Sequence, residues 1–125
     1  GFRIDNRSLR RAGLDYWDEV DRTVHASLEA FLEAAPADRC WFFSKNATRR
    51  YDSVVYRRGD WLVFGSETHG LPEAILESAG ERLVGIPMGP GAVRSLNLAS
   101  AASIALYEAL RQNGFEGLGL KEPDD

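Results

Sequence analysis

Residues 86–112, IPMGPGAVRSLNLASAASIALYEALRQ, decide the fold that this sequence predicts. They join the apolar end of a predicted strand to a loop rich in glycine and proline, which runs into a long predicted helix. Backbone amides converge where such a loop meets a helix, and α/β proteins commonly bind small molecules at this kind of junction. We therefore expect a ligand site between the strand and the helix.

The second half of this stretch has the spacing of an amphipathic helix. Small and apolar side chains recur at helical intervals, at Leu98, Ala101, Ala102, Ala105, Leu106, Ala109 and Leu110. Ser95 or Asn97 can cap the first turn, and Asn113 with Gly114 tolerates the left-handed backbone that ends a helix. The pattern predicts a helix over residues 96–113. Its spacing favours an ordinary core helix, and its alanine-rich stripe also suits a subunit interface.

Two continuous bulky runs upstream predict strands that are buried on both faces. They are CWFFS at residues 40–44 and WLVF at residues 61–64, and residues 82–86 give a third strand. Strands that alternate with helical patterns predict an α/β fold, with a mostly parallel sheet and helices on both faces, in a single domain over residues 1–125. Ligands bind such sheets beyond the carboxyl ends of the strands. The loops after Phe43, Phe64 and Ile86 are therefore the candidate site.

Local signals in the other segments are weaker. They predict a short helix through Leu9 and Arg11 that ends at Gly13, and a better helix that begins at Thr23. Residues 53–56 predict a short extended piece, and Pro72 fits the first position of another helix. Residues 117–125 have the composition of a loose acidic tail.

The composition describes one globular domain. The chain has 125 residues, of which 44% are hydrophobic and 27% are charged, a balance typical of a protein that buries a core. No apolar run approaches the length that crosses a membrane, and no signal segment opens the chain. Cys40 is the single cysteine, so an internal disulfide is excluded and a reducing cytoplasm is the expected location. Two scattered histidines make a metal centre unconvincing.

The net charge of −4 argues against a protein coated for non-specific nucleic-acid binding. Arginines nevertheless cluster at residues 49–50 and 57–58, and at positions 7, 10 and 11. We expect such clusters to be solvated faces or salt-bridge partners more often than phosphate contacts. The sequence allows an RNA-binding surface without showing one.

The motifs exclude several classes of site. The run GSETHG at residues 65–70 has Glu67 where the dinucleotide-binding fingerprint requires its second glycine, and it is not a phosphate-binding loop. Ser95 lies outside any nucleophile elbow, which makes a serine hydrolase improbable. His69 is a lone loop histidine, and Cys40 in its apolar strand has the setting of an inert core thiol. By spacing alone, GSETHG is a tight turn between strand and helix.

Three blocks together carry a family resemblance. GFRIDNRSLRRAGLDYW at residues 1–17, WLVFGSETHGLP at residues 61–72 and the opening stretch at residues 86–112 resemble the SPOUT superfamily of RNA methyltransferases. Within it they are similar to the tRNA (cytidine-34/uridine-34) 2′-O-methyltransferases, which modify the ribose of the wobble nucleotide. The resemblance implies an S-adenosylmethionine-dependent enzyme with a trefoil-knotted α/β fold. It also implies a tRNA substrate and a homodimer that forms through the C-terminal helix, without a metal or a membrane.

The resemblance also implies roles for individual residues. The positions that match the family's cofactor contacts are Phe43, Gly65, Ile86 and Ser95. Glu67 and Asn97 match polar positions of the family motifs and are the candidate catalytic residues, and Arg94 lies beside them as a candidate RNA-phosphate contact. Methyl transfer from a sulfonium needs alignment of the ribose hydroxyl and a route for its proton, and it needs no metal.

One departure from the family pattern concerns the start of the chain. In the family, the segment that matches Gly1 and Phe2 follows a strand, a helix and a further strand, which carry an asparagine/arginine motif. We expect this sequence to be a trimmed portion of a longer protein.

Two alternatives to methylation of the wobble nucleotide stay open. One is 2′-O-methylation of another tRNA or rRNA position, and the other is a non-catalytic RNA-binding or dimerisation module of the same fold.

Overall fold

A five-stranded sheet with the order β2-β1-β4-β3-β5 forms the middle layer of the protein. The computed structural model describes residues 9–13, 22–25, 28–65, 70–89 and 98–121. The strands are β1 (Leu9–Gly13), β2 (Arg22–His25), β3 (Cys40–Phe43), β4 (Trp61–Phe64) and β5 (Leu83–Val84). The helices are α1 (Leu28–Ala34), α2 (Glu73–Ser78) and α3 (Leu98–Gln112), with short 3₁₀ turns at Ala37–Arg39, Tyr51–Ser53 and Gly80–Arg82.

The three strands that the bulky runs predicted are parallel. β3 lies between β4 and β5, and Phe43 is in register with Phe64 on one side and Val84 on the other. The third strand is shorter than predicted, because Gly85 leaves β5 and pairs with Arg50 of the loop after β3. The carboxyl ends of the parallel strands β3, β4 and β5 lie at the same edge of the sheet.

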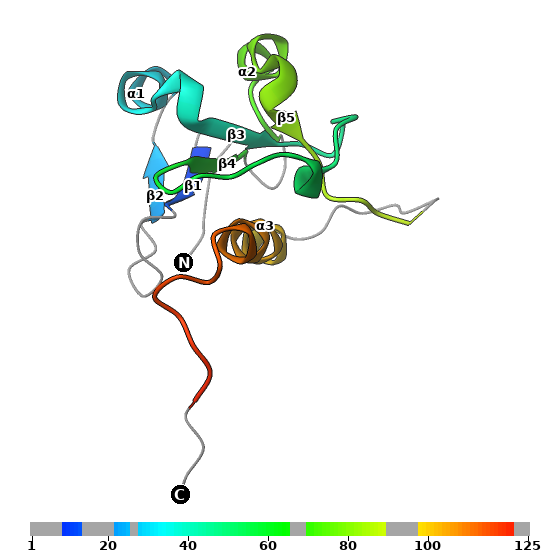
Figure 1. Ribbon diagram of the computed structural model, residues 1–125. Coiled ribbons are helices and arrows are strands. Elements are labelled where there is room, and N and C mark those ends of the chain that lie inside the picture. Colours follow the sequence, from blue (N-terminus) through cyan, green and yellow to red (C-terminus); the bar gives the residue numbers. More distant parts are fainter. Residues whose placement is uncertain (1–8, 14–21, 26–27, 66–69, 90–97, 122–125) are drawn as a thin grey trace, which may run out of the picture.

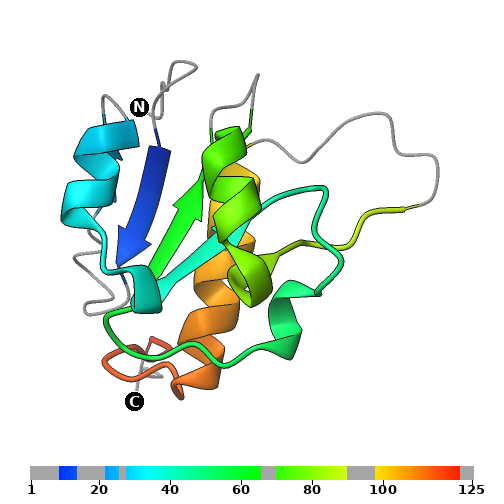
Figure 2. The ribbon, with the colours of Figure 1, turned by 90° about the horizontal axis from the view of Figure 1, so that it is seen from above.

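Helices cover both faces of the sheet, as predicted. Figures 1 and 2 show α1 and α2 over one face and α3 across the other. Alternation along β4 sends Leu62 and Phe64 into the core under α3, and Val63 into the core under α1 and α2. The first core contains Phe43, Val54, Tyr56, Leu62, Phe64, Val84, Leu98, Ala105 and Ala109. The second contains Phe31, Cys40, Phe42, Val63, Leu71 and Ile75.

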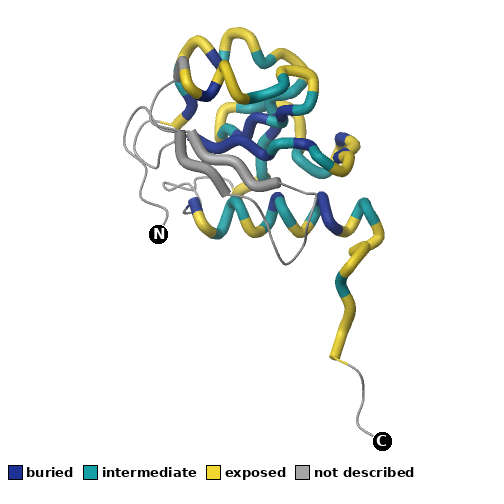
Figure 3. The backbone as a smooth tube through the Cα atoms, turned by 90° about the vertical axis from the view of Figure 1, so that its left-hand side faces the viewer, coloured by how far each residue is buried: buried dark blue, intermediate teal, exposed yellow. Residues whose placement is uncertain are grey.

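The predicted C-terminal helix is present as α3, within two residues of the expected bounds. Its small apolar stripe lies against the sheet of the same chain, and Ala105 and Ala109 are fully buried there. Figure 3 shows buried and exposed residues alternating along it. The core-helix interpretation is therefore confirmed, while Ala101, Ala102 and Leu106 of the stripe are only partly buried. The helix ends before Gly114, whose φ is 72°.

The N-terminal predictions were wrong. Residues 9–13 form strand β1 and not a helix, because β1 pairs antiparallel with β2 on one side and with β4 on the other. The helix expected from Thr23 begins only at Leu28, because residues 22–25 form β2. Long-range pairing overrides the weak local helical signal in both segments.

Residues 53–56 agree with their prediction of an extended piece only in part. They contribute no strand to the sheet, and the segment begins with the 3₁₀ turn Tyr51–Ser53 before the backbone becomes extended at Val54. Pro72 is the N-cap residue of α2, one residue before the first helical position that the sequence predicted for it. Within the described part of the chain, no helix is long and apolar enough to cross a membrane.

Candidate functional site

Three predicted cofactor positions lie at one edge of the parallel sheet, here called the carboxyl edge. Phe43 is the last residue of β3, Gly65 directly follows β4, and Ile86 lies two residues after β5. Because β3 is in register with both neighbours, the three positions are adjacent across the sheet. The structure thus brings together residues that are far apart in the sequence, at the place where parallel sheets bind ligands.

Phe43 forms an apolar floor at this edge. Its ring is stacked on that of Phe64, with 4.8 Å between the ring centroids and an interplanar angle of 18°. Both side chains are buried in the core under α3. Phe43 therefore presents a fixed backbone end and a rigid ring behind it, and it has no group that can carry out proton transfer.

Gly65 is a point of close backbone approach. A Cβ atom at this position would lie 2.0 Å from the carbonyl carbon of Gly70 and 2.3 Å from the amide nitrogen of Leu71. The backbone of Gly70 and Leu71 therefore lies directly against Gly65, and only glycine, which has no Cβ atom, fits at this position. This gives a physical reason for Gly65 that is independent of any ligand.

The backbone at Gly85 and Ile86 is held by the loop after β3. The N–H of Gly85 donates to the carbonyl of Arg49 (2.9 Å), and the N–H of Tyr51 donates to the carbonyl of Gly85 (2.8 Å). Ile86 is half-buried and packs against the core under α3. Among the residues that the structure describes, its own N–H and C=O have no hydrogen-bond partner. We therefore treat them as candidate hydrogen-bonding groups for a ligand at the carboxyl edge.

The other predicted site residues lie outside the described residues. They are Glu67, Arg94, Ser95 and Asn97, and His69 is among them as well. The nearest described residue after this group is Leu98, which is buried in the same core as Phe43 and Val84. The roles of these four residues stay predictions.

Three of the four arginines in the clusters at residues 49–50 and 57–58 are ion-paired. Arg49 lies 3.6 Å from Glu81, and Arg58 lies 3.3 Å from Glu116. Arg50 pairs with Asp52. The interpretation as salt-bridge partners is therefore confirmed for these three residues.

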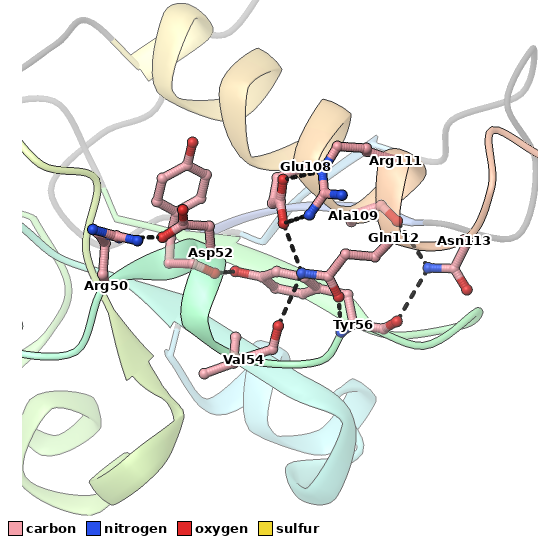
Figure 4. Close-up of polar contacts among 10 residues, drawn as sticks. Arg50, Asp52, Val54, Tyr56, Glu108, Ala109, Arg111, Gln112 and Asn113 are labelled. Atoms are coloured by element: carbon pink, nitrogen blue, oxygen red, sulfur yellow. Dashed lines mark hydrogen bonds and ion pairs between the residues drawn. The ribbon is translucent and has the colours of Figure 1, made fainter.

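Sequence reasoning missed a polar network at the other end of α3, shown in Figure 4. The side-chain amide of Gln112 accepts from the N–H of Tyr56 and donates to the carbonyl of Val54, both at 2.9 Å. Asn113 donates to the carbonyl of Tyr56 at 3.1 Å. Two amide side chains that close a helix were the only sequence signal. The network replaces the strand hydrogen bonds that residues 54–56 lack.

Burial changes the acidity of one member of this network. The Tyr56 side chain is buried, which raises the pKa of its phenol well above the ordinary value, and the nearby Glu108 carboxylate adds to the shift. Tyr56 is therefore a neutral hydrogen-bond donor at physiological pH. Within the described ranges, no group of three or more histidine, cysteine, aspartate or glutamate side chains is placed to hold a metal ion.

Comparisons with known proteins identify the family of the chain. The family described as "SpoU rRNA Methylase family" matches residues 1–107. The tRNA (cytidine(34)-2′-O)-methyltransferase of Saccharophagus degradans is 45% identical over 118 residues, which cover 94% of this chain and 76% of that protein.

Two solved structures are also similar. One, from work on "the 2-OH methylation of C/U34 on tRNA", is 47% identical with a TM-score of 0.65 and covers 81% of this chain and 62% of its own. A putative RNA methyltransferase from Bacillus anthracis is 37% identical with a TM-score of 0.70, over 88% of this chain and 70% of its own. On these matches, the chain belongs to the SpoU rRNA methylase family and has the α/β fold of its SPOUT relatives.

Proposed function

We propose that this chain is an enzyme that methylates the ribose 2′-hydroxyl of nucleotide 34 of tRNA, with S-adenosylmethionine as the methyl donor. One observation carries the proposal: Phe43, Gly65 and Ile86 lie side by side at the carboxyl edge, in a chain that is 45% identical to a tRNA (cytidine(34)-2′-O)-methyltransferase. The chain spans 62% of the similar solved structure from the work on C/U34. The activity, the substrate and the partners therefore all belong to the proposal.

The carboxyl edge suits the adenosine part of this cofactor. A flat, largely apolar group with hydrogen-bonding edges is held well by main-chain groups above an apolar floor. Ile86 offers a main-chain donor and acceptor without partners among the described residues, and Phe43 lies behind it. The close contact of Gly65 with Gly70 and Leu71 brings a second stretch of backbone to the same edge.

When bound, S-adenosylmethionine supplies an electrophilic methyl group, and a new bond from the ribose oxygen replaces the methyl–sulfur bond as the hydroxyl proton leaves. The chain's task is to align that hydroxyl and to accept its proton. We assign acceptance of the proton to the Glu67 carboxylate and alignment of the hydroxyl to the Asn97 amide, with Ser95 as a further cofactor contact and Arg94 as a phosphate contact. The chain is expected to form the family's trefoil knot around this site.

The proposal includes a homodimer in the cytoplasm. Because the most buried residues of the α3 stripe pack against the sheet, we assign the contact with a second copy to the opposite face of this helix, where Ala99, Ser103 and Tyr107 are exposed. Two serines make a matched test, since each donates its hydroxyl to the carbonyl four residues earlier at 2.9 Å and each is exposed. Ser103→Arg should give a monomer in light scattering, and Ser78→Arg on α2 should leave the dimer intact.

The deciding experiment is methyl transfer from labelled S-adenosylmethionine to unmodified tRNA transcripts. A transcript with cytidine or uridine at nucleotide 34 should accept label, and the same transcript with a 2′-deoxyribose at that nucleotide should accept none. Label that persists in the deoxy transcript would assign another RNA position. Binding of the cofactor without transfer to tRNA or rRNA would instead favour a non-catalytic RNA-binding module.

A further inference from the structure

Residues 49–56, here called the 49–56 segment, connect the C-terminal end of α3 to the carboxyl edge of the sheet. At one end, Gln112 and Asn113 hold the backbone of Val54 and Tyr56. At the other end, the carbonyl of Arg49 accepts a hydrogen bond from the N–H of Gly85, and the N–H of Tyr51 donates to the carbonyl of Gly85. The segment therefore touches two elements that are distant in the sequence.

A single side chain joins the two ends of the segment. The hydroxyl of Tyr56 donates to the main-chain carbonyl of Tyr51, as Figure 4 shows. The ring of Tyr56 is 2% exposed and packs edge-on against Trp41, with 5.5 Å between the ring centroids. Because the core fixes the ring, the hydroxyl is a fixed anchor for the peptide at Tyr51.

The loop after β3 packs closely against the backbone of Gly85. A Cβ atom at Gly85 would lie 2.9 Å from the carbonyl oxygen of Ser44 and 3.3 Å from the Cβ of Ala47. The loop after β3 thus lies directly against this backbone, and Gly85 cannot shift toward the loop without a clash. Ile86, the next residue, carries the main-chain groups that the proposed function assigns to the cofactor.

We propose that Tyr56 is a positioning residue for the cofactor site, and that its hydroxyl sets the backbone at Gly85 and Ile86 through the main chain of Tyr51. The inference rests on the proposed function for the identity of the ligand. Tyr56 itself belongs to the core and acts only through the 49–56 segment.

The first test needs no cofactor. Tyr56→Phe removes one hydroxyl and keeps the buried ring, so amide hydrogen exchange at Tyr51 and Gly85 should become about fivefold faster, the effect of one ordinary hydrogen bond. The amide of Ser44, which donates to the carbonyl of Val84 at 3.0 Å in the same part of the sheet, is the internal control and should stay protected. Equal exchange in wild type and variant would overturn the proposal.

The second test is calorimetric titration with S-adenosylmethionine. Tyr56→Phe should weaken binding about three- to tenfold. Phe31→Leu is the control for lost stability, because Phe31 lies in the other core, on the far face of the sheet. Its affinity should equal that of wild type. If both variants lose affinity alike, the effect is general destabilisation and the positioning role is wrong.

A third variant guards against misfolding of the first. The hydroxyl of Ser53 is exposed and donates at 2.6 Å to the carbonyl of Arg50, on the peptide whose N–H donates to Gly85. Ser53→Ala should therefore also speed exchange at Gly85 and weaken binding, and unchanged values would count against the proposal. If wild type binds no S-adenosylmethionine, the proposed function fails, and the exchange experiment still decides the role of Tyr56.

Discussion

The two ends of the same parallel strands are finished in different ways. At the amino ends of β3 and β4, a buried carboxylate closes the sheet: Asp60 accepts hydrogen bonds from Trp41 Nε1 (2.9 Å), Arg39 Nε (3.2 Å) and the N–H of Arg57 (2.8 Å). At the carboxyl ends, the backbone closes on itself at Gly65, and Ile86 keeps main-chain groups without described partners.

This difference has a physical cause. A buried carboxylate is costly unless its oxygens are hydrogen-bonded, and Asp60 meets this need through three donors. Among the described residues at the carboxyl edge, Ile86 has main-chain groups without hydrogen-bond partners. We therefore infer that the amino edge serves stability, and we propose the carboxyl edge for binding.

The largest expected effect is at Gly65. Gly65→Ala would place a methyl group 2.0 Å from the backbone at Gly70, so the backbone segments at Gly65 and Gly70 have to move apart. We expect a loss of about 3 kcal/mol in the free energy of unfolding and no detectable S-adenosylmethionine binding. Urea melts and calorimetry measure the two. Gly89→Ala is the control at the same edge, because a Cβ there meets nothing within 4 Å.

Asp60 should give the opposite pattern. Asp60→Ala leaves Trp41, Arg39 and the Arg57 amide without their acceptor, and we expect a loss of about 2 kcal/mol in the free energy of unfolding. The affinity of the folded variant for S-adenosylmethionine should be unchanged, since the amino edge lies at the other end of the strands. A tenfold loss of affinity would mean that the two edges are coupled and that the division proposed here is wrong.

Alkaline pH tests the network that links α3 to the sheet. Burial raises the pKa of Tyr56, so the native state keeps the phenol proton at a pH where the unfolded chain, with an ordinary tyrosine pKa of about 10, releases it. The contribution of Tyr56 is intact below about pH 10 and is lost as the pH rises above it. Free energies of unfolding from urea melts between about pH 8 and 11 should fall more steeply for wild type than for Tyr56→Phe, by about 1 kcal/mol at the upper end. Parallel curves would contradict the burial of a neutral phenol.

The same contrast explains what sequence reasoning found. β3 and β4 were predictable because strands buried on both faces consist of continuous bulky residues, as in Cys40–Phe43. β1 was not, because LRRAG has a weak strand propensity and forms a strand by pairing with β2 and with β4, the latter some fifty residues later in the chain. The positions at Phe43, Gly65 and Ile86 came from the family resemblance. The hydrogen bond from Tyr56 to Gln112 joins residues 56 apart and carries no local signal.

The smallest expected effect concerns charge at the two edges. Arg58 precedes Asp60 at the amino edge and pairs with Glu116 at 3.3 Å, with 58% and 70% of the two side chains exposed. An exposed pair of this kind contributes little to folding, so Arg58→Ala should change the free energy of unfolding by less than about 0.5 kcal/mol. Because the charge of Arg58 is balanced and lies away from the carboxyl edge, the variant should also keep the KM for tRNA and its dependence on salt.

Arg94→Ala is the matched comparison for Arg58→Ala. Loss of one phosphate contact should raise the KM for tRNA and lower the slope of its salt dependence by about one. If Arg58→Ala reduced the salt slope as well, RNA would reach the amino edge, and the carboxyl edge alone would not define the binding surface.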